Sequence, residues 1–237
     1  MTAKHISPQE INRNLIVYAV CMILAVIGMG YGHVIKAQYP LLRVWDYPAI
    51  LMLLAGVPFL WVQTQAGIPN FLDNTVSGRQ RWVRPALIGA GFGILDVMVI
   101  KCLLHPEPYT EWPPFIQPFP YSLFLYFSGA FEIEVFYRLI PLTIMLLAGT
   151  WVANGKYANI FFVAGAALTA LREPLEQWPD GALWFVVYAW VTGFGMNYCQ
   201  ALYLKNAGFL ASLTLRLGHY VCWHILLGIY IQYVELA

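Results

Sequence analysis

Charge is what this chain has least of. Only 11% of its 237 residues are Asp, Glu, Lys or Arg, whereas soluble domains contain about 25%. Hydrophobic residues make up 60% of the chain, and its mean hydropathy is +0.63. This composition excludes an ordinary soluble domain and predicts an integral membrane protein. The net charge of +1 supplies no basic surface, so we expect no nucleic-acid partner.

The chain also lacks cysteine motifs and a cleavage signal. All four cysteines fall inside apolar stretches, and none forms a CxxC pair, so neither a disulfide framework nor a metal knuckle is predicted. The first apolar stretch has no pattern of small residues for cleavage. We therefore expect it to be kept as a helix and not removed as a signal peptide.

Long apolar runs recur along the chain. A helix needs about 20 residues to cross a membrane. Seven spans are predicted, at about 14–35, 46–65, 84–104, 121–149, 157–171, 182–204 and 208–233. The fifth is short and is expected to end at Arg172-Glu173-Pro174, because proline disfavours further helix; a pair between Arg172 and Glu176 is then not expected. The fold class is all-α, a polytopic transmembrane helical bundle that forms one domain over 1–237. It has seven helices, or eight if residues 1–13 or a split fourth span add one.

The chain ends and the connections set an orientation. Ser7 and Glu10 form a capping box around Pro8, so a helix is expected to start there, with residues 1–13 as an interfacial lead-in. Short cytoplasmic connections are rich in Lys and Arg. Seven basic residues lie on the side of the N-terminus and two on the other: Lys4, Arg13, Arg79, Arg81, Arg84, Lys156 and Lys205, against Lys36 and Arg43. This predicts a cytoplasmic N-terminus. We expect the membrane to be a bacterial inner membrane.

A proline-rich connection at 105–120 also contains Trp112, Phe115 and Phe119. Proline fixes the backbone without needing a hydrogen-bond partner for its nitrogen. We expect a stiff external loop against the lipid headgroups, with a partner-docking surface as the alternative.

Ionisable residues inside or beside the predicted spans are the strongest functional signal. A charge at mid-helix in hydrocarbon costs about 2.5–3.5 kcal/mol, so such groups are expected to face the protein interior. Acids and guanidiniums balance, which predicts pairing in a functional site or in a cluster that only holds helices together. The residues are Glu132, Glu134, Arg138, Arg172, Glu173, Arg216, His219 and His224.

Spacing suggests how some of these residues pair. Glu134 and Arg138 are four apart and so share a helical face, where an ion pair forms naturally. Glu132 points elsewhere and needs a partner from another helix or water. Asp96 and Lys101 lie apart from these residues and are expected to be an interhelical pair or a snorkelling group.

The last span carries a similar cluster. Arg216, Tyr220 and His224 are spaced four apart and so share one face of the helix, and His219 flanks that face.

The run Ala130–Arg138 (AFEIEVFYR) resembles the first motif of the CPBP family, the CAAX-processing and bacteriocin-processing intramembrane endopeptidases. That motif is two adjacent glutamates, three residues and an arginine, so Glu134 and Arg138 match its second glutamate and its arginine. The resemblance extends over about 80–230. It implies a CPBP-like core and an endopeptidase that acts on a membrane-associated peptide or a prenylated protein.

The chain departs from the CPBP pattern at the catalytic positions. The first glutamate, which activates water in the family, falls on Ile133, and the histidine of the second motif falls on Arg172. Arg216, His219 and His224 each fail to reproduce the third motif. Arginine cannot act as a base because its guanidinium stays protonated, although it can donate to an oxyanion.

Two functions follow from this comparison. The first is a membrane protein with a degenerate site, acting as a non-catalytic accessory or assembly subunit, or as a binding protein, of a membrane complex. The alternative is an active endopeptidase with Glu132 or Glu134 as base and His219 or His224 as donor. The expected partners are the lipid bilayer and either a membrane protein or a membrane-embedded substrate.

We predict no cofactor and no metal. A zinc site would need three convergent ligands, for which Glu132 with His219 and His224 are the available set. The last span has no lysine for a retinal Schiff base. Haem ligation by His33, His219 or His224 stays open, although a lone histidine on an apolar helix is more often a hydrogen-bonded core residue.

Overall fold

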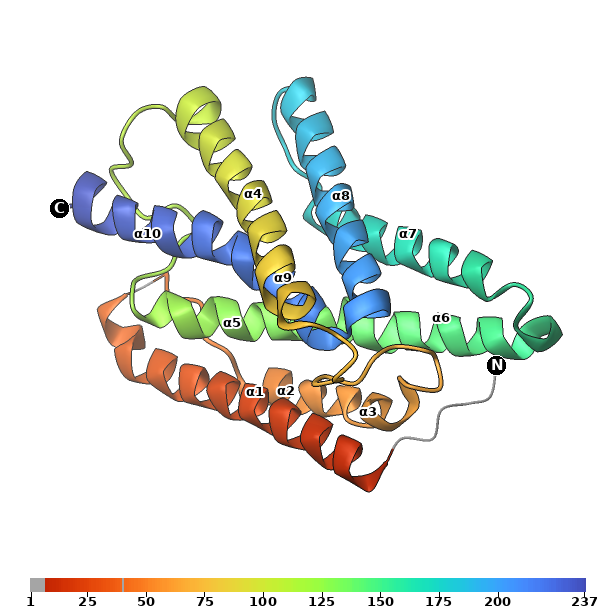
Figure 1. Cartoon of the computed structure of the whole chain (residues 1–237). Helices are drawn as coiled ribbons and strands as arrows, with labels where there is room; N and C mark the ends of the chain where they lie inside the picture. The colour runs from red at the N-terminus through yellow and green to blue at the C-terminus, as the bar shows by residue number, and fades with distance from the viewer. Residues whose placement is uncertain (1–6, 40) are drawn as a thin grey trace.

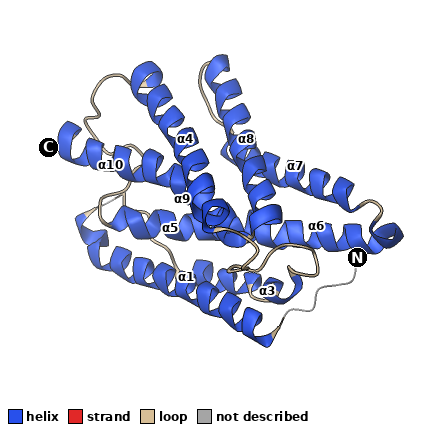
Figure 2. Cartoon of the chain, viewed as in Figure 1, coloured by secondary structure: helices blue, strands red, loops and turns tan. Residues whose placement is uncertain are grey.

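The computed structural model describes residues 7–39 and 41–237, and no strand occurs in this part of the chain (Figure 2). Seven helical rods follow one another. They are α1 (Pro8–Ile35), the bent α2–α3 rod (Tyr47–Met52 and Phe59–Val62), α4 (Arg84–Val99), the α5–α6 rod (Tyr121–Glu134 and Ile140–Trp151), α7 (Ala158–Gln177), α8 (Leu183–Ala207) and the α9–α10 rod (Phe209–Tyr220 and Leu227–Tyr230). The all-helical class and seven of the predicted elements are therefore confirmed for the described residues.

Wider π-helical turns interrupt or extend several rods. They flank α4 at Arg79–Val83 and Ile100–Leu104, join α5 to α6 at Val135–Leu139, join α9 to α10 at Val221–Leu226 and extend α10 at Ile231–Glu235. Such turns shift the angular position of every side chain that follows them. The fourth predicted span is consequently one continuous rod that is not split.

The start of α1 matches the prediction. Ser7 accepts a hydrogen bond from the Glu10 amide, and the Glu10 side chain bonds back to Ser7. Residues 8–13, however, are the first turns of α1 and not a separate lead-in. Residues 1–6 of that predicted lead-in, with Lys4 of the predicted cytoplasmic set, lie outside the described residues.

The predicted end of the fifth span is wrong. Helix α7 continues through Pro174 to Gln177. The proline ring is accommodated because Gly193 of α8 faces it; a Cβ at Gly193 would lie 3.2 Å from the Pro174 Cγ. Since the helix continues, Arg172 and Glu176 do pair, with Nε and Oε1 2.8 Å apart.

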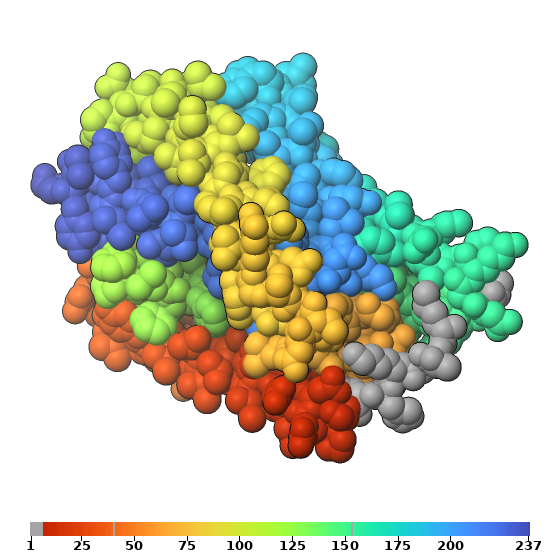
Figure 3. Space-filling view, in the orientation of Figure 1, coloured from red at the N-terminus to blue at the C-terminus, as the bar shows by residue number. Residues whose placement is uncertain are grey.

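The α9 segment lies at the centre of the bundle. Helix α4 crosses it on one side, while α5 and α8 pack against it on others (Figure 1). Helix α1 lies along α5, and α7 packs between α6 and α8. In the space-filling view α4, drawn in yellow, covers the middle of the visible face (Figure 3). Residues from five helices can therefore meet around α9.

The contact between α4 and α9 depends on glycine. A Cβ at Gly89 would lie 1.8 Å from the Leu215 carbonyl oxygen, and one at Gly218 would lie 2.3 Å from the Ala86 carbonyl oxygen. Only a residue without a side chain permits the two backbones to approach so closely. This contact fixes the register of α4 against α9.

Two described helices are long and apolar enough to cross a membrane. They span Pro8–Gln38, with mean hydropathy 2.2, and Arg79–Leu104, with mean hydropathy 2.1. Only 33% and 17% of their most apolar stretches are buried inside the protein. Their outward faces carry large apolar side chains: Ile16, Val20, Ile23 and Val34 on α1, and Leu87, Ile94 and Met98 on α4.

Candidate functional site

Three remote segments bring acids and guanidiniums together in the interior. Glu134 comes from the end of α5, Glu173 from α7 and Arg216 from α9. The Arg216 guanidinium binds the Glu173 carboxylate through two hydrogen bonds, of 3.0 and 2.8 Å, and its Nε lies 3.3 Å from Glu134 Oε1. Glu134 and Arg216 are 0% exposed, and Glu173 is 9% exposed. The predicted convergence of these charges is confirmed.

Two amides of α8 complete this buried cluster. Asn197 Oδ1 accepts from Nη2 of Arg216, at 2.8 Å, and from Nη2 of Arg138. Gln200 Oε1 accepts from the same two nitrogens at 2.9 and 3.3 Å, while Gln200 Nε2 donates to Glu134 Oε1 at 2.7 Å. Neither residue is among those predicted from the sequence. Two amides three apart on an apolar helix would have been the signal, because an amide in hydrocarbon needs partners.

Ser212 binds the second carboxylate oxygen of Glu134. Its hydroxyl donates to Glu134 Oε2, and Glu134 Oε1 is already engaged by Gln200 and Arg216. Both oxygens of this fully buried carboxylate are therefore occupied. We call Glu134, Arg138, Glu173, Asn197, Gln200, Ser212 and Arg216 the buried charge cluster.

The expected direct pair between Glu134 and Arg138 does not form; Glu134 pairs with Arg216 instead. The π-helical turn Val135–Leu139 begins directly after Glu134 and changes the angle between the two side chains. Pro141 follows that turn and has no N–H for the Tyr137 carbonyl. The Arg138 guanidinium donates to that carbonyl at 2.8 Å.

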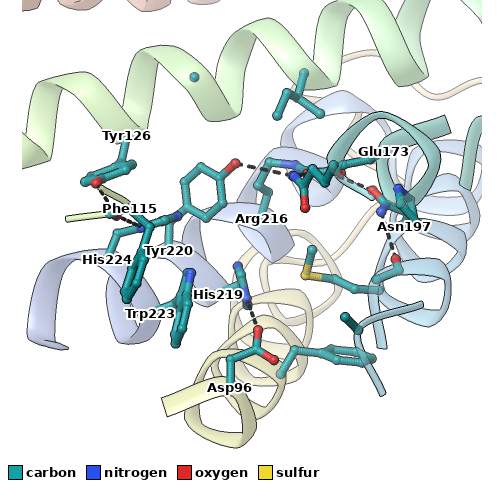
Figure 4. Close-up of a pocket in the computed structure, with 18 of the residues that line it drawn as sticks. Asp96, Phe115, Tyr126, Glu173, Asn197, Arg216, His219, Tyr220, Trp223 and His224 are labelled. Carbon is teal, nitrogen blue, oxygen red and sulfur yellow. Dashed lines mark hydrogen bonds and ion pairs between the residues drawn. The ribbon is translucent and has the colours of Figure 1, made fainter. Parts of the chain in front are cut away.

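Beside the buried charge cluster lies a cavity of about 860 Å³, which we call the central cavity. Its walls come from α4, α5, α7, α8, α9, the α1–α2 connection and the 105–120 loop. In Figure 4 Arg216, Glu173 and Asn197 lie at one end, Tyr126 and His224 at the other, and Tyr220 between them. Of the predicted candidates, Glu132, Glu173, Arg216, His219 and His224 line it.

His219 pairs with Asp96 of α4, a residue that was expected to lie apart from the other ionisable residues. Its Nε2 lies 2.7 Å from Oδ2 of Asp96 on α4, and the Tyr188 hydroxyl donates to Oδ1 of Asp96 at 2.5 Å. Lys101 is turned away and pairs with Glu235, at 2.7 Å. The Asp96 carboxylate thus links α4, α8 and α9 at the wall of the central cavity.

Glu132 and His224 occupy other parts of the wall. The Glu132 side chain has no hydrogen bond or ion pair among the described residues, and it lines the central cavity. His224 Nδ1 lies 2.9 Å from the Phe115 carbonyl oxygen, and its ring stacks on Tyr126 at 4.0 Å. Phe115 itself stacks on Trp223 at 5.1 Å. The proline-rich loop therefore folds back to form a wall of the cavity.

Arg172 does not join the buried charge cluster. It is about half exposed, pairs with Glu176 and stacks over the Tyr137 ring at 3.9 Å. The next residue of α7, Glu173, points inward in its place. His33 is exposed on α1 and does not line the cavity. In residues 7–39 and 41–237 no group of three His, Cys, Asp or Glu could hold a metal ion.

Comparisons with known proteins add little to this geometry. No family profile matches the chain, and no solved structure matches it. A stretch of 55 residues is 40% identical to nucleolar protein 6 of Mus musculus, and it covers 22% of this chain and 5% of that protein. The chain thus spans a small part of the length of that relative. A match so short shows no family, and it carries no argument about function.

Proposed function

We propose that this chain is a polytopic membrane protein with a CPBP-like core that works by binding and not by catalysis. Its role is that of an accessory or assembly subunit, or a binding protein, of a membrane complex. The membrane assignment is supported by the two helices that can span a bilayer and by their exposed apolar faces. A soluble monomer rarely exposes contiguous apolar surface of this extent.

The direction of the ionisable side chains supports the same assignment. Arg138, Arg216 and Glu134 are fully buried, whereas Ile, Leu and Val side chains face outward on α1 and α4. The start of α1 and the α6–α7 turn lie toward one end of the bundle, and the C-terminus toward the other (Figure 1). Of the predicted cytoplasmic set, Arg81 and Lys205 donate to carbonyls of the 66–73 connection, and Asn70 of that connection bonds to Glu10 and Asn14 at the start of α1. A bacterial inner membrane with a cytoplasmic N-terminus fits this distribution.

One observation carries the non-catalytic role: both oxygens of Glu134 are occupied. A general base must be free to accept a proton from water within hydrogen-bond reach. Glu134 instead accepts from Gln200, Arg216 and Ser212 and has no exposed surface. The residue that matches the CPBP motif is therefore built into the protein interior as an ion-pair partner.

The test compares binding with cleavage. Tagged protein is purified from its own membranes in a mild neutral detergent, and co-purified proteins are quantified against it. The same preparation is incubated with membrane-anchored peptides, beside the Glu134→Gln variant and the exposed control Glu111→Gln. We expect a stoichiometric membrane partner and no cleavage by any of the three. Cleavage by the native protein that is lost only in Glu134→Gln would refute the proposal.

An active endopeptidase is the second candidate, and one observation favours it. Glu132 lines the central cavity without a partner among the described residues, and the Asp96–His219 pair lines the same cavity. Glu132 could act as base in place of Glu134, with His219 as proton donor. In that case peptide cleavage should occur, should be lost in Glu132→Gln and Asp96→Asn, and should survive in Glu111→Gln.

A further inference from the structure

The central cavity holds more negative than positive side chains. Four carboxylates line it, those of Asp46, Asp96, Glu132 and Glu173, against the guanidiniums of Arg43 and Arg216. Arg216 is fully buried, and its nitrogens are engaged by the buried charge cluster. It therefore offers nothing to an incoming ligand.

The other positive group also has a partner. Arg43 is exposed at the α1–α2 connection, and its Nη2 donates to the Tyr126 hydroxyl at 3.1 Å. On the acidic side, Asp46 caps α2 through the Ala49 amide, and Asp96 binds Tyr188 and His219. Of the four carboxylates, Glu132 alone has no hydrogen bond or ion pair in the described part of the chain.

The cavity that Glu132 lines has largely aromatic walls. Trp45 of the α1–α2 connection and Phe92, Phe185, Tyr188 and Trp223 of the helical rods line it as well. An unpaired carboxylate in such surroundings is unfavourable unless a cation or a proton meets it. Aromatic faces attract cations electrostatically, so the walls and the carboxylate favour the same ligand charge.

From this juxtaposition we infer that the central cavity binds an amphipathic organic cation, with Glu132 as its counter-ion and the aromatic walls around its apolar body. The volume of about 860 Å³ lies within the range of cavities that hold small organic ligands. The inference rests on the proposed function, because it names the class of ligand that the non-catalytic cavity takes.

The experiment uses two probes of equal shape and opposite charge, tetraphenylphosphonium and tetraphenylborate. Their binding to the full-length protein in neutral maltoside micelles is measured by equilibrium dialysis. We expect tetraphenylphosphonium to bind about tenfold more tightly or better, and Glu132→Gln to lose most of that difference. Glu111→Gln, which neutralises an exposed carboxylate outside the cavity, should bind as the native protein does.

A second measurement needs no variant and so does not depend on the folding of Glu132→Gln. Dodecyltrimethylammonium should compete with bound tetraphenylphosphonium, whereas dodecanoate, an anion with a tail of similar length, should not. Equal binding of the two tetraphenyl probes, preference for tetraphenylborate, or no binding of either would overturn the inference. Those outcomes leave the peptide-cleavage result untouched, so failure of the inference is distinct from failure of the proposed function.

Discussion

Replacing Glu173 with glutamine tests whether the buried charge cluster stabilises the fold. The change keeps the shape of the side chain but removes the negative acceptor of two hydrogen bonds from Arg216, of 2.8 and 3.0 Å. Arg138 and Arg216, both without exposed surface, would then share one carboxylate, that of Glu134. Breaking a buried ion pair in this way costs about 3–5 kcal/mol.

A matched control lies one helical turn away. Glu176, like Glu173, accepts a hydrogen bond from an arginine, in this case Arg172 of the same helix. The side chains of Arg172 and Glu176 are, however, 49% and 50% exposed. Exposed pairs contribute about 0–1 kcal/mol, so Glu176→Gln should change the free energy of unfolding little. Unfolding by sodium dodecyl sulfate in mixed micelles, followed by fluorescence of the nine tryptophans, measures both variants.

The double variant Glu173→Gln, Arg216→Gln tests how much of the loss of stability comes from the lost ion pair and how much from the unpaired charge that a single substitution leaves buried. Because it removes one charge of each sign, its loss of stability should be smaller than the sum of the two single losses. If Glu173→Gln destabilises no more than Glu176→Gln does, the cluster is not the buried ionic network described above.

Three further predictions concern other parts of the molecule. Gly89→Ala should destabilise the protein by about 1–3 kcal/mol, because its Cβ would collide with the Leu215 carbonyl oxygen. Gly91→Ala should not, because there is open space around its Cβ. Thermal unfolding of both variants measures the difference in stability. Asn197→Leu should cost about 1–3 kcal/mol, because it removes a buried acceptor that Arg138 and Arg216 share, and a similar stability for Asn197→Leu and the native protein would contradict that role. Burial opposes ionisation of Glu235, but hydrogen bonds from Lys101 and the Tyr109 amide outweigh it and lower its pKa below the ordinary 4.5. The contribution of this pair is therefore present above pH 4.5 and is lost as the pH falls through the lowered pKa, so proteolysis of the 105–120 loop should increase there in the native protein. The increase should be smaller in Lys101→Met, which keeps only the Tyr109 amide as a donor to Glu235.

The sequence was sufficient to predict the convergence of Glu134, Glu173 and Arg216. The cost of isolated charges in apolar helices demands that they meet, whatever the details of the fold. The same reasoning could not identify the direct partners, because these depend on the angles between helices. An interhelical pair was one expectation for Asp96, but its partners, His219 of α9 and Tyr188 of α8, were not identified.

Local irregularities explain the remaining differences. Proline usually ends a helix, yet Gly193 on a neighbouring helix makes room for Pro174 and turns Arg172 outward. A π-helical turn after Glu134 rotates Arg138 toward Asn197 and Gln200. Neither effect has a signature within the local sequence, since each depends on what packs against the segment.

The close backbone contact between α4 and α9 at Gly89 and Gly218 limits how this protein can change conformation. With no side chain between them, α4 and α9 cannot slide or rotate past one another without atomic overlap, so the two behave as one rigid block. Asp96 and His219 stand on opposite members of that block, and their 2.7 Å separation should persist whether the space beside them is filled or empty. A ligand would then enter through a wall outside that block, and α7 and α8, which carry Glu173 and Asn197, form one such wall. Any such opening would pull directly on the ionic contacts of Arg216.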